Sequence, residues 1–82
     1  MPVYHFNLFD GEDRQDSVGS EHRDTGAAQI EAVRRMGGVL MDHAGRFWSG
    51  QEWTMQVTDA RGLVLFSLTL LGLQQRVHTA GN

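Results

Sequence analysis

Hydrophobic periodicity constrains the fold of this chain more than any other sequence feature. The two-residue period of a β-strand is visible in Val3–Phe9 and again over residues 52–59. From Ala27 onward the apolar residues instead recur every three or four positions, as they do on an amphipathic helix. The polar stretch 14–18 predicts a weak edge strand, and the apolar stretch 63–70 predicts a last strand. The predicted order is therefore strand, strand, helix, strand, strand.

Chain length limits the fold to one small domain. The chain has 82 residues and no cysteine, so packing and hydrogen bonds, rather than disulfides, must stabilise it. One helix lying across one sheet satisfies the predicted order of elements. We therefore expect an α+β, two-layer domain over residues 1–73, with one helix packed on a mostly antiparallel sheet. The polar C-terminal tail, 74–82, is expected to be frayed.

The two faces of the predicted strands differ in character. Asp10-Gly11 ends the first strand with a turn, and residues 59–62 form the last hairpin turn. The stretch 63–70 has apolar residues on both faces of the predicted strand, which indicates an interior strand or a strand that a partner buries. The helix is expected to cover the face formed by Tyr4, Phe6, Leu8, Trp53, Met55 and Val57.

The helix has recognisable boundaries. Asp24 or Thr25 can cap its N-terminus with a side-chain oxygen, and Gly45 is a natural stop. Residues 46–51 are then predicted to be a loop. The predicted core-facing stripe consists of Ile30, Val33, Gly37, Leu40 and Ala44.

Side chains four apart on the helix predict two ion pairs. Glu31 precedes Arg35, and Asp42 precedes Arg46, which is the favourable order. The unusual feature is Gly37-Gly38, because each mid-helix glycine costs about 1 kcal/mol relative to alanine. Close packing of the helix on the sheet at the first of these glycines, or a kink, accounts for them.

Charge and hydropathy restrict the partners that suit this chain. The net charge is −3 and every basic residue is arginine, so the chain is a poor electrostatic match for a nucleic-acid backbone. The longest apolar stretch, 63–73, is shorter than the roughly 20 residues of a membrane-spanning helix, and the N-terminus does not resemble a signal peptide. We expect a soluble, cytoplasmic protein without a membrane partner.

The acidic turn is the strongest candidate for a metal site. Asp10, Glu12 and Asp16 supply oxygens at the spacing of a calcium loop. Arg14, however, occupies the ligand position between them, and no glycine stands at the sixth position of the loop. None of the four histidines pairs with another at the short spacing typical of zinc sites. We therefore interpret this segment as a hairpin turn and expect no metal or other cofactor.

No pattern in the chain predicts catalysis. Ser17, His22 and Asp24 are neighbours in sequence only, and no serine occupies a strand-to-helix elbow. A domain of this size rarely encloses a cavity of several hundred cubic ångströms. We expect a protein that is not an enzyme.

An interaction surface is the remaining prediction. Phe47 and Trp48, together with Phe9, form an exposed aromatic patch or else cap the end of the core. The sheet face opposite the helix mixes polar and apolar groups, which suits a protein contact, and a symmetric dimer would cover it. The candidate surface consists of His5, Asn7, Phe9, Phe47, Trp48, Leu63 and Leu65.

The order of these motifs resembles that of a family of small bacterial proteins known as a domain of unknown function. An aromatic strand with Asp-Gly, a short segment with two aspartates around a glycine, an alanine-rich helix and a tryptophan-led hairpin follow one another over roughly residues 1–70. His22 and Gly37-Gly38 depart from the pattern. The resemblance implies a bacterial protein and carries over no catalytic residue or cofactor. The residues involved are Tyr4, Phe6, Asp10, Gly11, Asp16, Gly19, Asp24, Ala27, Ala28, Glu31, Ala32, Trp53, Val57, Asp59, Gly62 and Leu65.

Two functions stay open at this point. The first is a non-enzymatic module that contacts another protein or associates with itself as a homo-oligomer. The second is a small regulator that binds a small ligand or a nucleic acid, for which a basic concave surface or an occupied cavity would be required.

Overall fold

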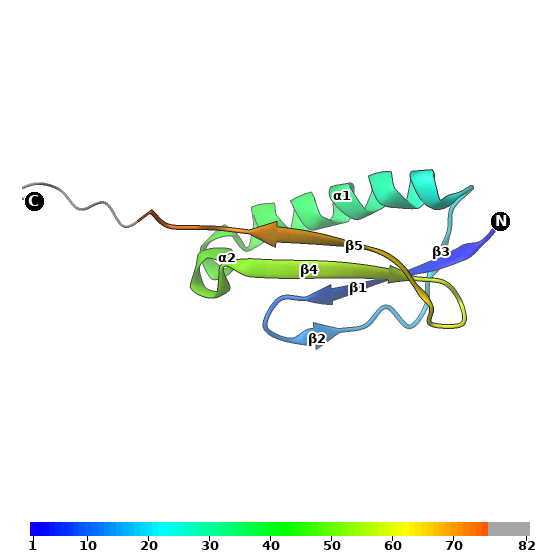
Figure 1. The fold of residues 1–82 in the computed structure, drawn as a ribbon, viewed down its shortest axis with the longest axis horizontal. Coiled ribbons are helices and arrows are strands. Elements are labelled where there is room, and N and C mark those ends of the chain that lie inside the picture. Colours follow the sequence, from blue (N-terminus) through cyan, green and yellow to red (C-terminus); the bar gives the residue numbers. More distant parts are fainter. Residues whose placement is uncertain (76–82) are drawn as a thin grey trace, which may run out of the picture.

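The protein is an α+β, two-layer domain with a mostly antiparallel sheet, as the sequence predicts. The computed structural model describes residues 1–75. The sheet runs in the order β2-β1-β4-β5, and β3 pairs with the other end of β1. In Figure 1 the helical layer lies over one face of the sheet. The strands are β1 (Val3–Phe9), β2 (Asp13–Arg14), β3 (Ser20–Glu21), β4 (Glu52–Thr58) and β5 (Val64–Leu71), and the helices are α1 (Thr25–Asp42) and α2 (Ala44–Gly50).

Alternation in β1 and β4 builds the sheet side of the core, as predicted. The side chains that face α1 are buried, and those of the opposite face of β1 are half-buried. Phe6 pairs with Val57, and Leu8 pairs with Met55. The buried residues of the sheet are Tyr4, Phe6, Leu8, Trp53, Met55 and Val57, and those of the helices are Ala28, Ala32, Met36 and Phe47.

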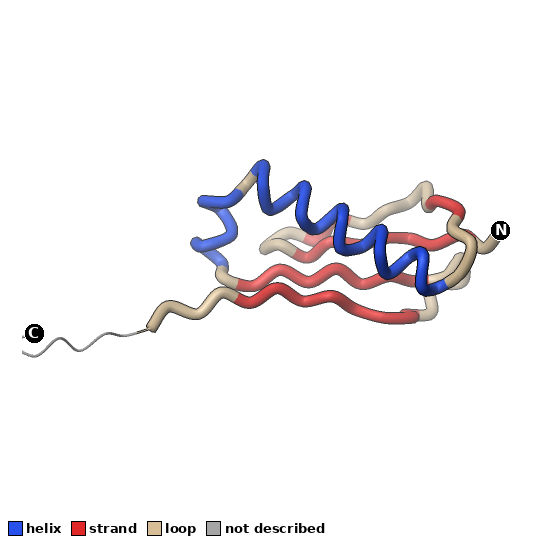
Figure 2. The backbone as a smooth tube through the Cα atoms, turned by 90° about the horizontal axis from the view of Figure 1, so that it is seen from above, coloured by secondary structure: helices blue, strands red, loops and turns tan. Residues whose placement is uncertain are grey.

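Helix α1 begins where the sequence predicts it, but it turns a different face toward the sheet from the one predicted. Asp24 caps it, because its Oδ1 accepts a hydrogen bond of 2.8 Å from the Ala27 backbone N–H. Helix α1 crosses the sheet diagonally (Figure 2) and presents small residues to it. The predicted stripe through Ile30 and Val33 is wrong, since these side chains are 57% and 59% exposed. Alanines face the sheet because the large rings on β1 and β4 already fill the space between the layers.

The segment after α1 corrects the predicted stop and loop. Gly45 lies inside α2, and residues 46–51 are mostly helical rather than a loop. Phe47 is 7% exposed and packs edge-to-face on Trp53, with ring centroids 5.5 Å apart. Burial of this ring favours the short helix over the loop that its glycines indicate. Helix α2 ends at Gly50 and is capped by Gln51, whose φ of +64° is left-handed.

Strand β5 is an outer strand, so the predicted interior position is wrong. Its only strand neighbour among residues 1–75 is β4. A register shift between Val57 and Thr58 places Val64 opposite Thr58, on the sheet face away from α1. Phe66 lies opposite Val57 on the helix side. The irregularity therefore moves Val64 off the face on which a simple two-residue period places it.

The predicted strand 14–18 is also wrong. Two separate two-residue pieces, β2 and β3, pair with opposite ends of β1 instead. The predicted edge position of this segment is nevertheless right. The predicted tail, 74–82, lies largely outside the described residues.

The predicted ion pairs and glycine packing on α1 have mixed outcomes. Arg35 Nε donates to Glu31 Oε2 at 2.8 Å, as predicted. The predicted partner of Asp42, Arg46, instead contacts Asp10. Close packing at Gly37 is wrong, because a Cβ added at Gly37-Gly38 would meet no atom within 4 Å.

Gly38→Ala is expected to stabilise the fold. The added methyl group meets no atom of the domain, and alanine gains up to about 1 kcal/mol over glycine in a helix interior. Urea denaturation should give a higher midpoint with an unchanged m-value. Gly11→Ala is the opposing control, since the φ of Gly11 is +100° and alanine there is strained. A lower midpoint for Gly38→Ala would contradict the open surroundings of that position.

Candidate functional site

Asp16 closes the outer edge of β1 between β2 and β3. Its Oδ2 accepts a hydrogen bond of 3.1 Å from the Phe6 backbone N–H, in the place of a missing strand. Its backbone N–H donates to Asn7 Oδ1 at 2.9 Å, and its carbonyl oxygen lies 2.7 Å from His5 Nδ1. Asp16 therefore occupies the gap between β2 and β3 and binds the Phe6 N–H there.

The Asp16 carboxylate also orders the loop that follows. Its Oδ1 accepts from the backbone N–H groups of Val18 and Gly19 at 3.2 and 2.9 Å. Burial raises the pKa of Asp16, but the N–H groups of Gly19, Phe6 and Val18, with the Arg35 charge, outweigh it, and the pKa lies below its usual value. This carboxylate is structural and fully engaged.

Asp10 joins the turn after β1 to helix α2. Its side chain is 0% exposed, and its Oδ2 lies 3.0 Å from Arg46 Nη2 and 3.2 Å from Arg14 Nε. These are close ion pairs, although Oδ2 has no hydrogen bond of good geometry. Burial raises the pKa of Asp10, yet the Glu12 N–H and the two guanidinium groups lower it further, to a net value below normal.

The acidic turn thus joins β1 to α2, and two arginines neutralise Asp10, one of the three carboxylates considered for calcium. Within residues 1–75 no group of three or more His, Asp or Glu side chains is arranged to hold a metal ion.

One serine does contact a histidine. Ser20 Oγ lies 3.0 Å from His22 Nε2 and accepts a hydrogen bond of 3.2 Å from Arg35 Nη2. The His22 ring packs edge-to-face against Tyr4 and Phe6. Because neither Ser20 nor His22 lines the cavities described below, this pair is better explained as packing around β3 than as a nucleophile with its base.

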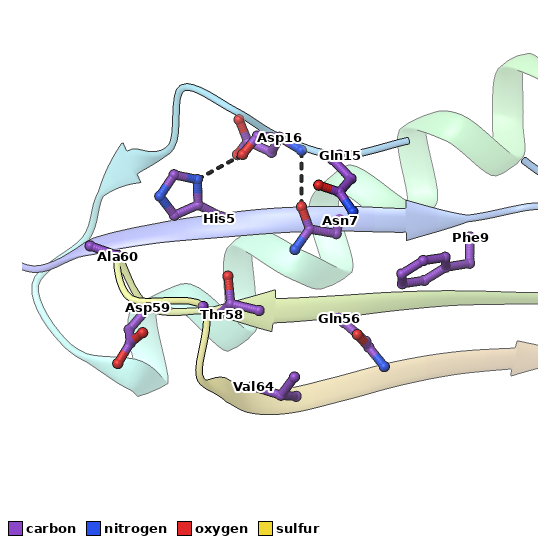
Figure 3. Close-up of a pocket in the computed structure, with 11 residues that line it drawn as sticks. His5, Asn7, Phe9, Gln15, Asp16, Gln56, Thr58, Asp59, Ala60 and Val64 are labelled. Carbon is purple, nitrogen blue, oxygen red and sulfur yellow. Dashed lines mark hydrogen bonds between the residues drawn. The ribbon is translucent and has the colours of Figure 1, made fainter. Parts of the chain in front are cut away.

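A polar cavity of about 370 Å³ lies on the sheet face opposite α1. The His5 Nδ1 must donate to the Asp16 carbonyl oxygen, so Nε2 of the neutral ring is an acceptor. Asn7 Oδ1 is already engaged, so its NH₂ group is the free donor. Figure 3 shows both side chains held by Asp16. The lining comprises His5, Asn7, Phe9, Gln15, Asp16, Gln56, Thr58, Asp59, Ala60, Gly62 and Val64.

A second, apolar cavity of about 190 Å³ opens between α1 and β5. Its walls carry no ionisable group. Leu68 and Leu70 of the outer strand are only half-buried in it. The lining comprises Val33, Met36, Gly37, Leu40, Leu68 and Leu70.

The residues predicted as one interaction surface lie in separate places. His5, Asn7 and Phe9 share the polar sheet face, whereas Phe47 is buried in the core. Trp48 is 55% exposed, at the end of the sheet near Gly72.

Leu63 and Leu65 are exposed around the start of β5. Sequence reasoning missed the cavity between α1 and β5, because it expected Val33 to face the core. The structural role of Asp16 had one signal, an aspartate three residues before a glycine, which is typical of a side chain that binds turn amides.

Protonation of the Asp16 carboxylate should contribute to the unfolding of the protein in acid. A carboxyl group whose pKa is lowered in the folded state adds stability above its unfolded pKa of about 3.9, and this stability is lost as the pH falls through the folded pKa. Asp16→Asn should therefore be less stable at pH 7 and lose less stability between pH 7 and pH 3 than the wild type. Urea midpoints at a series of pH values measure this.

The control for that experiment is Asp13→Asn, which removes one negative charge from the same segment without touching the amides that Asp16 binds. An Asp16→Asn variant whose stability falls with acid as steeply as that of the wild type would show that the carboxylate does not hold this edge.

Comparison with known proteins gives one match. A family model described as a domain of unknown function (DUF6894) matches residues 3–72. No curated protein and no solved structure matches the chain. No helix within the described part of the chain has the length and apolar character to cross a membrane.

Proposed function

The chain belongs to this family of unknown function, and we propose that it is a non-enzymatic protein-contact module of the bacterial cytoplasm that associates with itself. The observation that carries the proposal is β5. It is an outer strand, it spans eight residues, and none of them is charged. Proteins usually protect such edges with charges, proline or a covering segment. An unprotected apolar edge is typical of a surface that a partner covers.

Exposed apolar groups extend from β5 onto α1 and support the same interpretation. Val33 of α1 and Leu71 of β5 are each more than half exposed. Between the two elements lies the apolar cavity. Burial of contiguous apolar surface is the dominant favourable term in most protein association. A partner that covered this region would therefore gain more than one that covered the polar sheet face.

Mass measurement tests self-association directly. The monomer mass is 9.2 kDa, and light scattering at micromolar concentrations should give about twice that mass, falling toward the monomer value on dilution. A mass of 9.2 kDa at every concentration would overturn the proposal of self-association.

A second candidate function is the binding of a small ligand in the polar cavity. The preset acceptor on His5 and donor on Asn7 favour it, because fixed polar groups give a cavity directional specificity. No arginine lines the cavity, and both of its ionisable acids are aspartates. The lining therefore suits a neutral ligand rich in hydroxyl or amide groups and does not suit a phosphate.

Backbone amide shifts report such binding. Titration with a set of neutral polyol and amide compounds should move the resonances of Asn7, Gln56 and Thr58, and Asn7→Leu should remove the response. Shifts spread evenly over the domain, or none at millimolar compound, would exclude this function.

A further inference from the structure

We infer that two copies of the chain pair through their β5 strands, antiparallel and around a two-fold axis at Leu68, to form one continuous sheet. This inference rests on the proposed self-association and names its surface and geometry. It differs from a dimer that covers the polar sheet face, because that face stays open in the paired arrangement.

The two edges of the sheet differ, and only one is available. The outer edge of β1 is closed by β2, by β3 and by Asp16, which binds the Phe6 N–H between them. Charged residues also line it, among them Asp13 and Arg14. The outer edge of β5 carries no such device in the part of the chain that the structure describes. A second copy can supply the missing hydrogen-bond partners by strand addition.

Charge complementarity favours a second copy over a charged partner. A two-fold axis brings each residue near its own copy, so a charged edge would repel itself. Strand β5 is uncharged, and the flank of α1 beside it carries Val33, Gly37 and Leu40. The opposite flank of α1 carries the ion pair between Glu31 and Arg35. The uncharged flank is therefore the one that faces a second copy.

The placement of the helices supports the same geometry. An axis perpendicular to the sheet keeps both α1 helices on one face, side by side above the paired strands. Gly37 lines the apolar cavity, and an added Cβ there would meet nothing within 4 Å. No contact among residues 1–75 accounts for a mid-helix glycine at this position, whereas the close approach of a second α1 would.

The alternation of side chains between the two faces of β5 limits the register of the paired strands to a few possibilities. Phe66, Leu68 and Leu70 face α1, so they must pair with the same set in the second copy. Placing Leu68 on the axis pairs Phe66 with Leu70 and overlaps the regular part of β5 beyond its bulge. On the other face, Ser67 of one copy then lies opposite Thr69 of the second.

The contact area is that of a small, specific interface. Strand β5 has eight residues, and a strand of that length is about 27 Å long at ~3.4 Å per residue. With a sheet layer and a helix layer together about 20 Å deep, each copy would bury roughly 500 Å², so the pair reaches the lower bound of about 1,000 Å² for specific interfaces.

Disulfide trapping tests the register, and the cysteine-free chain makes it unambiguous. An equimolar mixture of Ser67→Cys and Thr69→Cys should form a disulfide-linked dimer under mild oxidation, because residues directly opposite across strands have Cβ atoms about 5 Å apart. Each variant alone should react far more slowly. Gln56→Cys is the control, since Gln56 pairs with Ser67 on the same face but lies one strand further from the edge.

Each outcome discriminates. A dimer mass without disulfide formation in the mixture leaves self-association intact and overturns the β5 pairing. A monomer mass overturns both. Rapid reaction of Ser67→Cys alone, or of Gln56→Cys, contradicts the axis at Leu68.

A charge on α1 provides a second measurement that does not depend on β5 chemistry. Val33→Lys places two like charges near the axis and should weaken the dimer at least about tenfold, with the folded monomer intact because Val33 is exposed. Val18→Lys is the control, since Val18 is also more than half exposed but follows Asp16, on the side of the closed sheet edge. Equal dimer affinities for the two variants would overturn the inference.

Discussion

The closure of one sheet edge by Asp16 is the interaction on which the rest of the structure depends. An open antiparallel sheet has two outer edges, and unpaired backbone groups at either edge can pair with another chain. Here the Asp16 carboxylate binds the Phe6 N–H in the middle of β1, between two short strands, and the Asp16 backbone binds side chains of the same strand. The same residue holds His5 and Asn7 in fixed orientations. Edge closure and the shape of the polar cavity therefore have one cause.

The small side chains on the sheet-facing side of α1 determine which apolar residues of the helix stay exposed. Ala28 and Ala32 are fully buried beneath the axis of α1, so the bulk of the core comes from the rings of Phe6 and Trp53. A helix held this close by alanines turns its larger apolar residues outward, and Val33 reaches solvent beside β5. The way the core is filled thus places an exposed apolar flank of α1 beside β5, where the proposed contact lies.

Sequence reasoning predicted the parts of the fold that follow from local pattern. The two-residue period located β1 and β4 and their buried faces, and the capping preference located Asp24 at the start of α1. The rotation of α1 could not be predicted, because an alanine stripe and a stripe of larger residues both have helical spacing.

Long-range contacts account for the remaining errors. Helix α2 forms because Phe47 packs on Trp53 of the next strand and Arg46 pairs with Asp10, which is distant in sequence. The hydrophobic pattern of residues 46–51 reveals neither partner. The same limit applies to the candidate site. The two-residue period predicted that His5 and Asn7 share a face, but only the fold shows that one loop orders both.

A single open edge also determines how far assembly can proceed. If both edges of the sheet were free, copies would add on either side and build an open-ended fibre. With one edge closed by Asp16, β2 and β3, each copy has only the edge of β5 to offer among its described strands. When two such edges pair in antiparallel orientation, each satisfies the backbone groups of the other, and the two-fold axis makes the dimer a closed assembly. In the proposed dimer, Asp16 would thereby limit assembly to two copies, because no strand edge among the described residues would be left for a third copy to extend.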